Sequence, residues 1–120
     1  MSVLSSRQRH RRASMDAISV FQFALVGKVL LGRFAESRHT HHDVIAVRQI
    51  AVRDWEPPWM FAEKVQSLQE QLGAFAERLD EEPLDQAAAA ALRRDFEELV
   101  SEARSAAASA WHKYACRRCR

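Results

Sequence analysis

The sequence predicts an all-α protein, a small up-down helical bundle, and three observations support this fold class. Only three glycines and three prolines occur in 120 residues, and long stretches are rich in alanine, glutamate, leucine and arginine, which favour helices. Apolar residues recur at heptad spacing in the second half. A chain of this length buries roughly two thirds of its unfolded surface, so one domain folds without disulfides.

The first helix is predicted over residues 13–37, after a flexible basic arm at 1–12. Its apolar residues form two stripes. One contains Ile18, Phe21, Leu25 and Val29, and the other contains Val20, Phe23, Ala24, Gly27, Leu31 and Phe34. A helix that is apolar most of the way round belongs at the centre of a bundle or in a subunit interface. Its apolar stretch is shorter than the roughly 20 residues that span a bilayer, so we expect a soluble protein.

Residues 38–42 are predicted to form a loop, and Asp43 is expected to cap a short element over residues 44–54. The valines and isoleucines of this element are also compatible with a strand, but its position among strongly predicted helices favours a helix. Pro57 and Pro58 end the element, because proline fits only the first turn of a helix.

The second half predicts a long antiparallel helical hairpin, with helices over about 59–82 and 84–115. Its apolar stripes, with alternating spacings of four and three, are Phe61, Val65, Leu68, Leu72, Phe75 and Leu79, then Leu92, Phe96, Leu99, Ala103, Ala106 and Ala110. Folding about the turn sets Leu68 opposite Phe96. The bulky end, which contains Trp59 and Phe61, then lies opposite the small residues Ala103, Ala106 and Ala107. The bundle then occupies residues 13–112, followed by a basic, cysteine-containing tail at 113–120.

Charge is distributed in blocks along the chain. Residues 1–53 contain nine Lys or Arg against three Asp or Glu, residues 54–102 contain four against thirteen, and residues 103–120 contain five against none. In an up-down bundle both basic ends fall at one pole, and the acidic turn around residues 80–85 falls at the other, beside residues 39–42. Such asymmetry indicates a polyanionic partner or charge-matched assembly.

The basic clusters predict contacts with the backbone of RNA or single-stranded DNA. Arginine suits this role because its planar guanidinium bonds phosphate oxygens two at a time. The candidate nucleic-acid-binding residues are Arg7, Arg9, Arg11, Arg12, Arg48, Arg53, Lys113, Arg117, Arg118 and Arg120. Docking onto an acidic protein surface and simple solubilisation are the alternatives. The aromatic cluster at residues 55–61 is expected in the core or an interface, and exposed aromatics there would mark a partner site.

Histidines and cysteines form two groups with the residue types of a metal site. These groups are His39, His41 and His42 in one loop, and His112, Cys116 and Cys119 at helix-compatible spacing. The C-terminal group supplies at most three of the four ligands that a structural zinc site needs, and the other group lies at the far pole. We therefore expect no metal, no cofactor, and reduced thiols in a cytoplasmic protein.

One pair of residues suggests catalysis. Arg33 and His39 form an Arg-x5-His pair, which resembles the motif of the small helical HEPN ribonucleases. That resemblance would imply RNA cleavage. The family usually has a polar residue directly after the arginine, however, and Phe34 stands there. We expect a protein that is not an enzyme.

In size, helical content and charge layout, the chain resembles the small helical subunits of multisubunit CRISPR effector complexes. The residues that carry the resemblance are the basic segments 7–12 and 113–120, Arg48 and Arg53, and the stripes at 61–79 and 92–110. It implies a non-catalytic subunit of a nucleoprotein assembly in antiviral defence, which contacts nucleic-acid backbone and other protein subunits and can stack head-to-tail. The alternative is a helical scaffold or adaptor that oligomerises or docks onto an acidic protein partner. Neither hypothesis involves a membrane.

Overall fold

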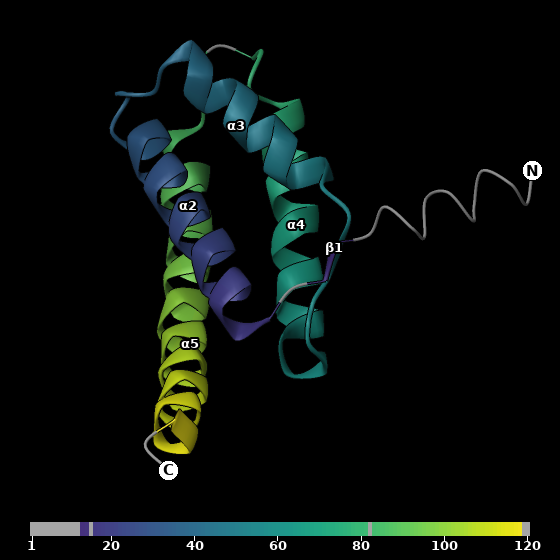
Figure 1. Ribbon diagram of the computed structural model, residues 1–120. Coiled ribbons are helices and arrows are strands. Elements are labelled where there is room, and N and C mark those ends of the chain that lie inside the picture. The colour runs from purple at the N-terminus through teal and green to yellow at the C-terminus, as the bar shows by residue number, and fades with distance from the viewer. Residues whose placement is uncertain (1–12, 15, 82, 119–120) are drawn as a thin grey trace, which may run out of the picture.

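The computed structural model describes residues 13–14, 16–81 and 83–118, and the side chains between residues 16 and 109. In chain order the elements are β1 (Ala13–Ser14), α2 (Ala17–Ala35), α3 (His41–Val52), β2 (Trp55–Glu56), the short 3-10 helix η1 (Trp59–Phe61), α4 (Ala62–Glu77) and α5 (Gln86–Arg118). The described part of the chain is an all-α bundle, as the sequence predicted (Figure 1).

Three helices follow the long axis of the molecule, and α3 crosses obliquely at one end (Figure 1). α2 packs along α5, whereas α3 packs mainly against α4. The start of α2 and the end of α5 lie toward the same end. The connection from α4 to α5 lies at the opposite end, beside the loop between α2 and α3, where the Gln86 side chain contacts the Ser37 hydroxyl. The acidic turn therefore lies where the sequence predicted, whereas residues 1–12 fall outside the described part.

The tightest helix pair is α2 with α5, and it depends on Gly27. A Cβ atom at this position would lie 2.3 Å from Cε1 of Phe96. The Phe96 ring is fully buried, and its centroid lies 5.4 Å from that of Phe23. Because Phe96 faces α2 so closely, the predicted register of the hairpin, with Leu68 opposite Phe96, is not confirmed.

Both heptad stripes of the second half are buried over most of their length, as predicted. The buried members are Phe61, Val65, Leu68, Leu72, Phe75, Leu92, Phe96, Leu99 and Ala103. Phe75 also reaches α2, because its ring lies edge-on to that of Phe34 with the centroids 5.5 Å apart. The helices α2, α4 and α5 therefore share one core.

The helix α3 confirms the preference for a helix over a strand, but it begins at His41 because Thr40, and not Asp43, is its N-cap. The Thr40 hydroxyl accepts a hydrogen bond from the Asp43 backbone N–H at 3.3 Å. The Asp43 carboxylate accepts one from the Thr40 backbone N–H at 2.8 Å, which completes a capping box. The prediction that Asp43 caps the helix is wrong by three residues.

The first helix starts later than predicted, because Ala13 and Ser14 form the strand β1. This strand pairs in parallel with β2, with Ala13 beside Trp55 and Ser14 beside Glu56. α2 begins only after Asp16, whose carboxylate accepts a hydrogen bond from the Ser19 backbone N–H at 2.8 Å. The pairing holds the chain before α2 against the connection from α3 to α4.

Candidate functional site

The structure describes the side chains of two predicted nucleic-acid-binding residues, Arg48 and Arg53, and both have partners within the chain. Arg48 Nη2 donates a hydrogen bond to Asp80 Oδ1 at 2.9 Å, which joins α3 to the turn after α4. The Arg53 guanidinium lies 4.6 Å from the Trp55 ring centroid, a cation–π arrangement. Each guanidinium carries five N–H donors, so these contacts leave further donors on both exposed side chains.

The side chains of the other eight candidates lie outside the part that the structure describes. Five of them, Arg7, Arg9, Arg11, Arg12 and Arg120, lie outside the described residues. Lys113, Arg117 and Arg118 belong to α5, but their side chains lie outside the described part. Because α5 continues through Arg118, these three residues occupy its last two turns. Their role in binding nucleic acid stays a prediction.

The two residues with ribonuclease-like spacing have separate partners. Arg33 Nη1 bonds Asp43 Oδ1 at 2.8 Å, and the His39 ring stacks on Phe34 with the centroids 4.5 Å apart. The hydrogen bond from the Thr40 backbone, and then the contact with Arg33, hold the pKa of the Asp43 carboxyl below its ordinary value, although burial opposes the shift. These contacts account for both residues as parts of the junction between α2 and α3.

Among the residues that the structure describes, no group of three or more His, Cys, Asp or Glu side chains is arranged to hold a metal ion. His39, His41 and His42 are all exposed around the start of α3. The second group falls outside the described side chains, since it consists of His112, Cys116 and Cys119.

The first apolar surface is the outer face of α2, which we define as Ile18, Leu25, Val26 and Val29. These four residues are 39% to 47% exposed. The other apolar stripe of α2 is buried, on the side that packs along α5. Of the first predicted stripe, Ile18, Leu25 and Val29 are exposed, whereas Phe21 is partly buried and packs against the core. Val26 belongs to neither predicted stripe. Within the described residues, α2 is also the one helix long and apolar enough to cross a membrane, a test that core helices of soluble proteins pass as well.

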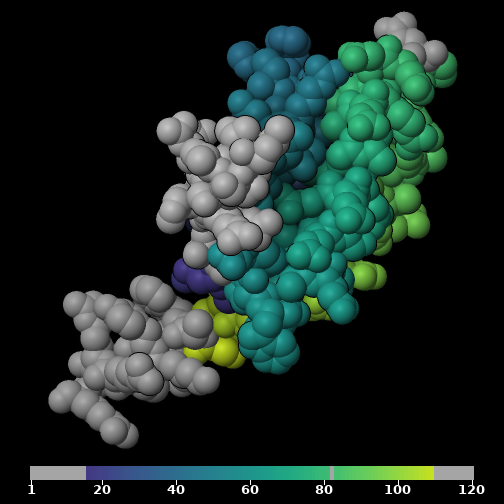
Figure 2. Space-filling model, turned by 90° about the vertical axis from the view of Figure 1, so that its right-hand side faces the viewer, coloured from purple at the N-terminus to yellow at the C-terminus, as the bar shows by residue number. Residues whose placement is uncertain are grey.

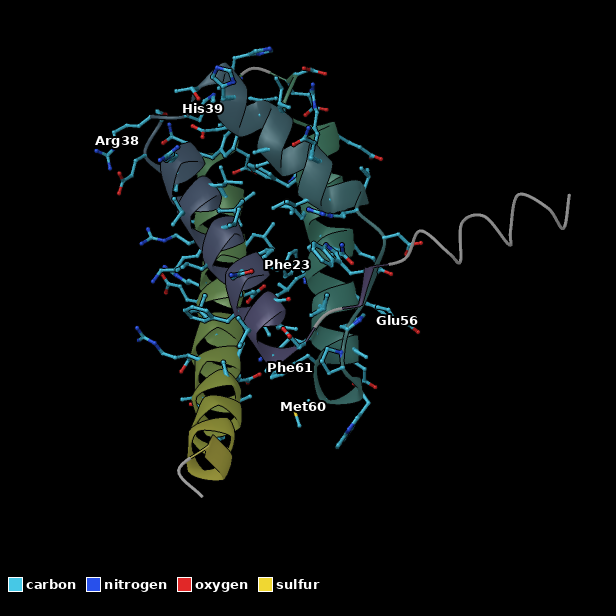
Figure 3. The ribbon with its side chains drawn as sticks, viewed as in Figure 1. Phe23, Arg38, His39, Glu56, Met60 and Phe61 are labelled. Atoms are coloured by element: carbon cyan, nitrogen blue, oxygen red, sulfur yellow. The ribbon has the colours of Figure 1, made fainter. Side chains whose placement is uncertain are left out.

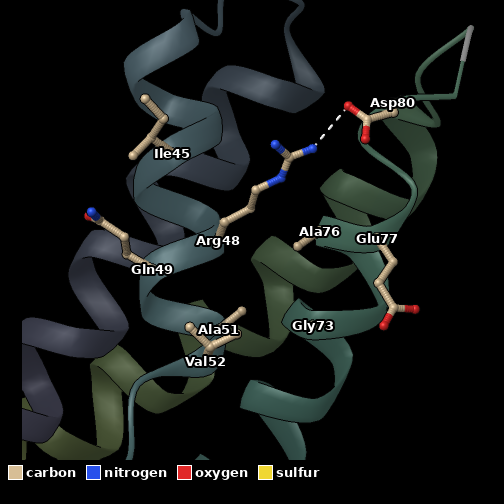
Figure 4. A pocket seen from close by; sticks show the side chains of 9 residues that line it. All are labelled: Ile45, Arg48, Gln49, Ala51, Val52, Gly73, Ala76, Glu77 and Asp80. Atoms are coloured by element: carbon tan, nitrogen blue, oxygen red, sulfur yellow. Dashed lines mark hydrogen bonds and ion pairs between the residues drawn. The ribbon is translucent and has the colours of Figure 1, made fainter.

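The second apolar surface is a groove of about 640 Å³ between α3 and α4, which we call the α3–α4 groove (Figure 4). Its apolar lining consists of Ile45, Ala51, Val52, Gly73 and Ala76, and its polar lining consists of Arg48, Gln49, Glu77 and Asp80. Val52 is 82% exposed. A Cβ atom at Gly73 would meet nothing within 4 Å, so the α4 side of the groove is open. Figure 2 shows the face of the molecule on which α3 and α4 lie side by side.

A third exposed apolar feature is the η1 turn. Trp59 and Met60 are 87% and 56% exposed, while Phe61 beside them is buried. In Figure 3 Met60 lies at the end of the molecule where α4 begins. The prediction that Trp59 packs against the alanines of the last helix is wrong. The exposed Trp59 instead fits the expectation that exposed aromatic side chains in residues 55–61 mark a partner site.

No protein-family model, curated protein or solved structure matches this chain. The candidate surfaces therefore rest on geometry alone. The α3–α4 groove is the part that the sequence reasoning missed. Two signals could have indicated it: the apolar residues of 44–54 cover more than one side of a helix, and Gly73 interrupts an amphipathic helix at a surface position.

Proposed function

We propose that this chain is a non-catalytic helical scaffold subunit. It works by associating with other protein chains, and first of all with further copies of itself. The observation that carries the proposal is the outer face of α2, where four aliphatic side chains remain exposed along three turns. Contiguous exposed apolar side chains of this kind mark interaction sites, whereas scattered ones do not.

The energetics favour covering this face. Each methylene group that leaves water contributes about 0.8 kcal/mol to the free energy of association. Burying the exposed parts of Ile18, Leu25, Val26 and Val29 would therefore add several contributions of this size. The helix itself is already held by its buried stripe. It therefore presents a preformed surface, and association does not have to order it.

A second candidate function is the binding of nucleic-acid backbone, favoured by the basic residues of the last turns of α5. After Glu102 the sequence contains no Asp or Glu, but it contains Arg104, Lys113, Arg117 and Arg118. The helix α5 continues to Arg118. This end of the helix would attract phosphate without reading bases. Both functions suit a small helical subunit of a CRISPR effector complex in the cytoplasm, a proposal that the all-α fold and the charge layout support.

Self-association is tested by sedimentation and light scattering over a range of protein concentrations. We expect the wild type to be oligomeric, and the double variant Leu25→Gln, Val29→Gln to be shifted toward monomer. Ala87→Gln is the matched control, because Ala87 is an exposed residue of a different helix, α5. A wild type that stays monomeric at all concentrations would refute the scaffold.

Nucleic-acid binding is tested with labelled single- and double-stranded oligonucleotides at about 50 and 200 mM salt, between which phosphate contacts lose affinity steeply. We expect removal of residues 113–120, or of residues 1–12, to abolish the salt-dependent binding. No binding at the lower salt concentration would eliminate this candidate for the isolated chain and leave the scaffold proposal untouched.

A further inference from the structure

The outer face of α2 and the α3–α4 groove are two separate apolar surfaces that have no partner within the described chain. One is convex, a helix that exposes Leu25, Val26 and Val29. The other is concave, with an apolar lining that includes the highly exposed Val52. An apolar helix face laid into an apolar groove is a recurring mode of protein recognition.

The dimensions of the two surfaces agree. The α3 side of the groove runs from Ile45 to Val52, which is about 10 Å of helix, or two turns. The part of α2 between Leu25 and Arg33 is about 12 Å long by the same measure. The open space above Gly73 gives such a helix room to approach α4 closely.

The charges at the edges of the two surfaces are complementary. The acidic groups on the α4 side of the groove are Glu77 and Asp80, both exposed. Asp80 is already paired with Arg48 of the groove, so Glu77 is the acidic group open to a partner. Beside the outer face of α2 stands Lys28, with no carboxylate between Asp16 and Glu36 in the sequence, whereas Arg33 of the same helix is already paired with Asp43. Neither Lys28 nor Glu77 forms an ion pair with any residue whose side chain the structure describes. Docking would supply each of them with an opposite charge.

We infer that the outer face of α2 in one copy of this chain docks into the α3–α4 groove of a second copy, with Lys28 facing Glu77. This inference rests on the proposed function and specifies its geometry. The contact is heterologous, because the two copies use different surfaces. The surfaces share no residue, so each copy uses both, and the assembly grows into a chain or closes into a ring.

Pairing of two α2 outer faces about a twofold axis is the competing arrangement. It would bring together two faces that are each flanked by the unpaired Lys28 and would leave the groove uncovered. The heterologous contact covers both surfaces and pairs opposite charges, and for this reason we favour it.

The test is complementation between two variants that each lack one surface. The face variant carries Leu25→Gln and Val29→Gln, and the groove variant carries Gly73→Leu, which places a side chain in the open space of the groove. We expect each variant alone to be monomeric and their mixture to form a 1:1 dimer that does not grow, measured by sedimentation. The association constant of each variant should fall about 100-fold, because each 1.4 kcal/mol of lost apolar burial lowers this constant roughly tenfold.

The controls separate this inference from the proposed function. Ala74→Leu puts the same side chain one position along α4, outside the groove, and should associate like the wild type. Circular dichroism spectra equal to that of the wild type show that the variants are folded. A groove variant that still associates like the wild type, while the face variant is monomeric, overturns the heterologous contact but supports self-association through α2. A monomeric wild type overturns both.

Charge reversal gives an independent measurement. Lys28→Glu and Glu77→Lys should each weaken association about two- to fivefold, the range for an exposed ion pair. The chain that carries both substitutions should recover wild-type association, because every contact then joins a reversed pair. Recovery supports the pairing of Lys28 with Glu77, and additive losses in the double variant overturn it.

Discussion

Replacing Gly27 by alanine should destabilise the protein, although alanine is the better helix former. In a helix interior the change from glycine to alanine contributes about 1 kcal/mol of stability. Against this gain stands the contact with Phe96, whose Cε1 and Cδ1 atoms would lie 2.3 and 2.4 Å from the new methyl group. The ring is fully buried and packs against Phe23, so it has no free space in which to move.

The magnitude follows from the two opposing terms. Overpacking of this kind costs about 1–3 kcal/mol, so the net change for Gly27→Ala lies between about zero and a loss of 2 kcal/mol. Gly73→Ala is the matched control, since it makes the same substitution on α4 where no atom lies within 4 Å. It should stabilise by about 0.5–1 kcal/mol. The two variants should thus differ by about 1–3 kcal/mol in the free energy of unfolding.

Urea denaturation followed by far-ultraviolet circular dichroism measures this difference, at one protein concentration because association shifts apparent stability. A double-mutant cycle locates the cause. In a Phe96→Leu background the clash is relieved, so Gly27→Ala should become neutral or stabilising. If Gly27→Ala proves as stable as Gly73→Ala, the close packing of α2 on α5 at this point is refuted.

Three further outcomes are expected. Asp43 has a lowered pKa in the folded state, so its ionised carboxylate stabilises the fold above the unfolded pKa of about 3.9, and this stabilisation is lost as the pH falls toward the folded pKa. Asp43→Asn should therefore make stability less dependent on pH in the acid range and should cost about 1 kcal/mol of stability at neutral pH. Leu68→Ala should cost about 2–5 kcal/mol in thermal or urea unfolding, and a smaller loss would mean that Leu68 lies outside the core. Lys64 bonds Glu102 at 2.8 Å across α4 and α5, yet Lys64→Met should change stability by less than about 1 kcal/mol, because the pair is exposed.

Much of the fold could be predicted because helical periodicity is a local property. The spacing of Val65, Leu68 and Leu72 depends only on their own helix, and all three are buried as expected. The partner of each stripe is a tertiary property. Nothing in the spacing of Phe96 distinguishes α4 from α2 as its neighbour, and the deciding feature is the missing side chain at Gly27.

Shorter-range features were harder to predict for a different reason. Thr40 and Asp43 both have cap-forming side chains, and the reciprocal hydrogen bonds between them decide which one is the cap. The strand β1 has only two residues, too few for any periodicity to be visible. Of the candidate surfaces, three residues of the outer face of α2, Ile18, Leu25 and Val29, could be grouped from the sequence, whereas the α3–α4 groove exists only once the two helices are placed together.

The parallel pairing of β1 with β2 has a practical consequence for labelling this protein. Ala13 lies beside Trp55, three residues after Val52 of the groove, so a fusion partner attached before residue 13 would be tethered next to the α3–α4 groove. An affinity tag or fluorophore there could block the surface under study and imitate the effect of Gly73→Leu. A label at the far end of α5 avoids this artefact and is the better choice for association experiments.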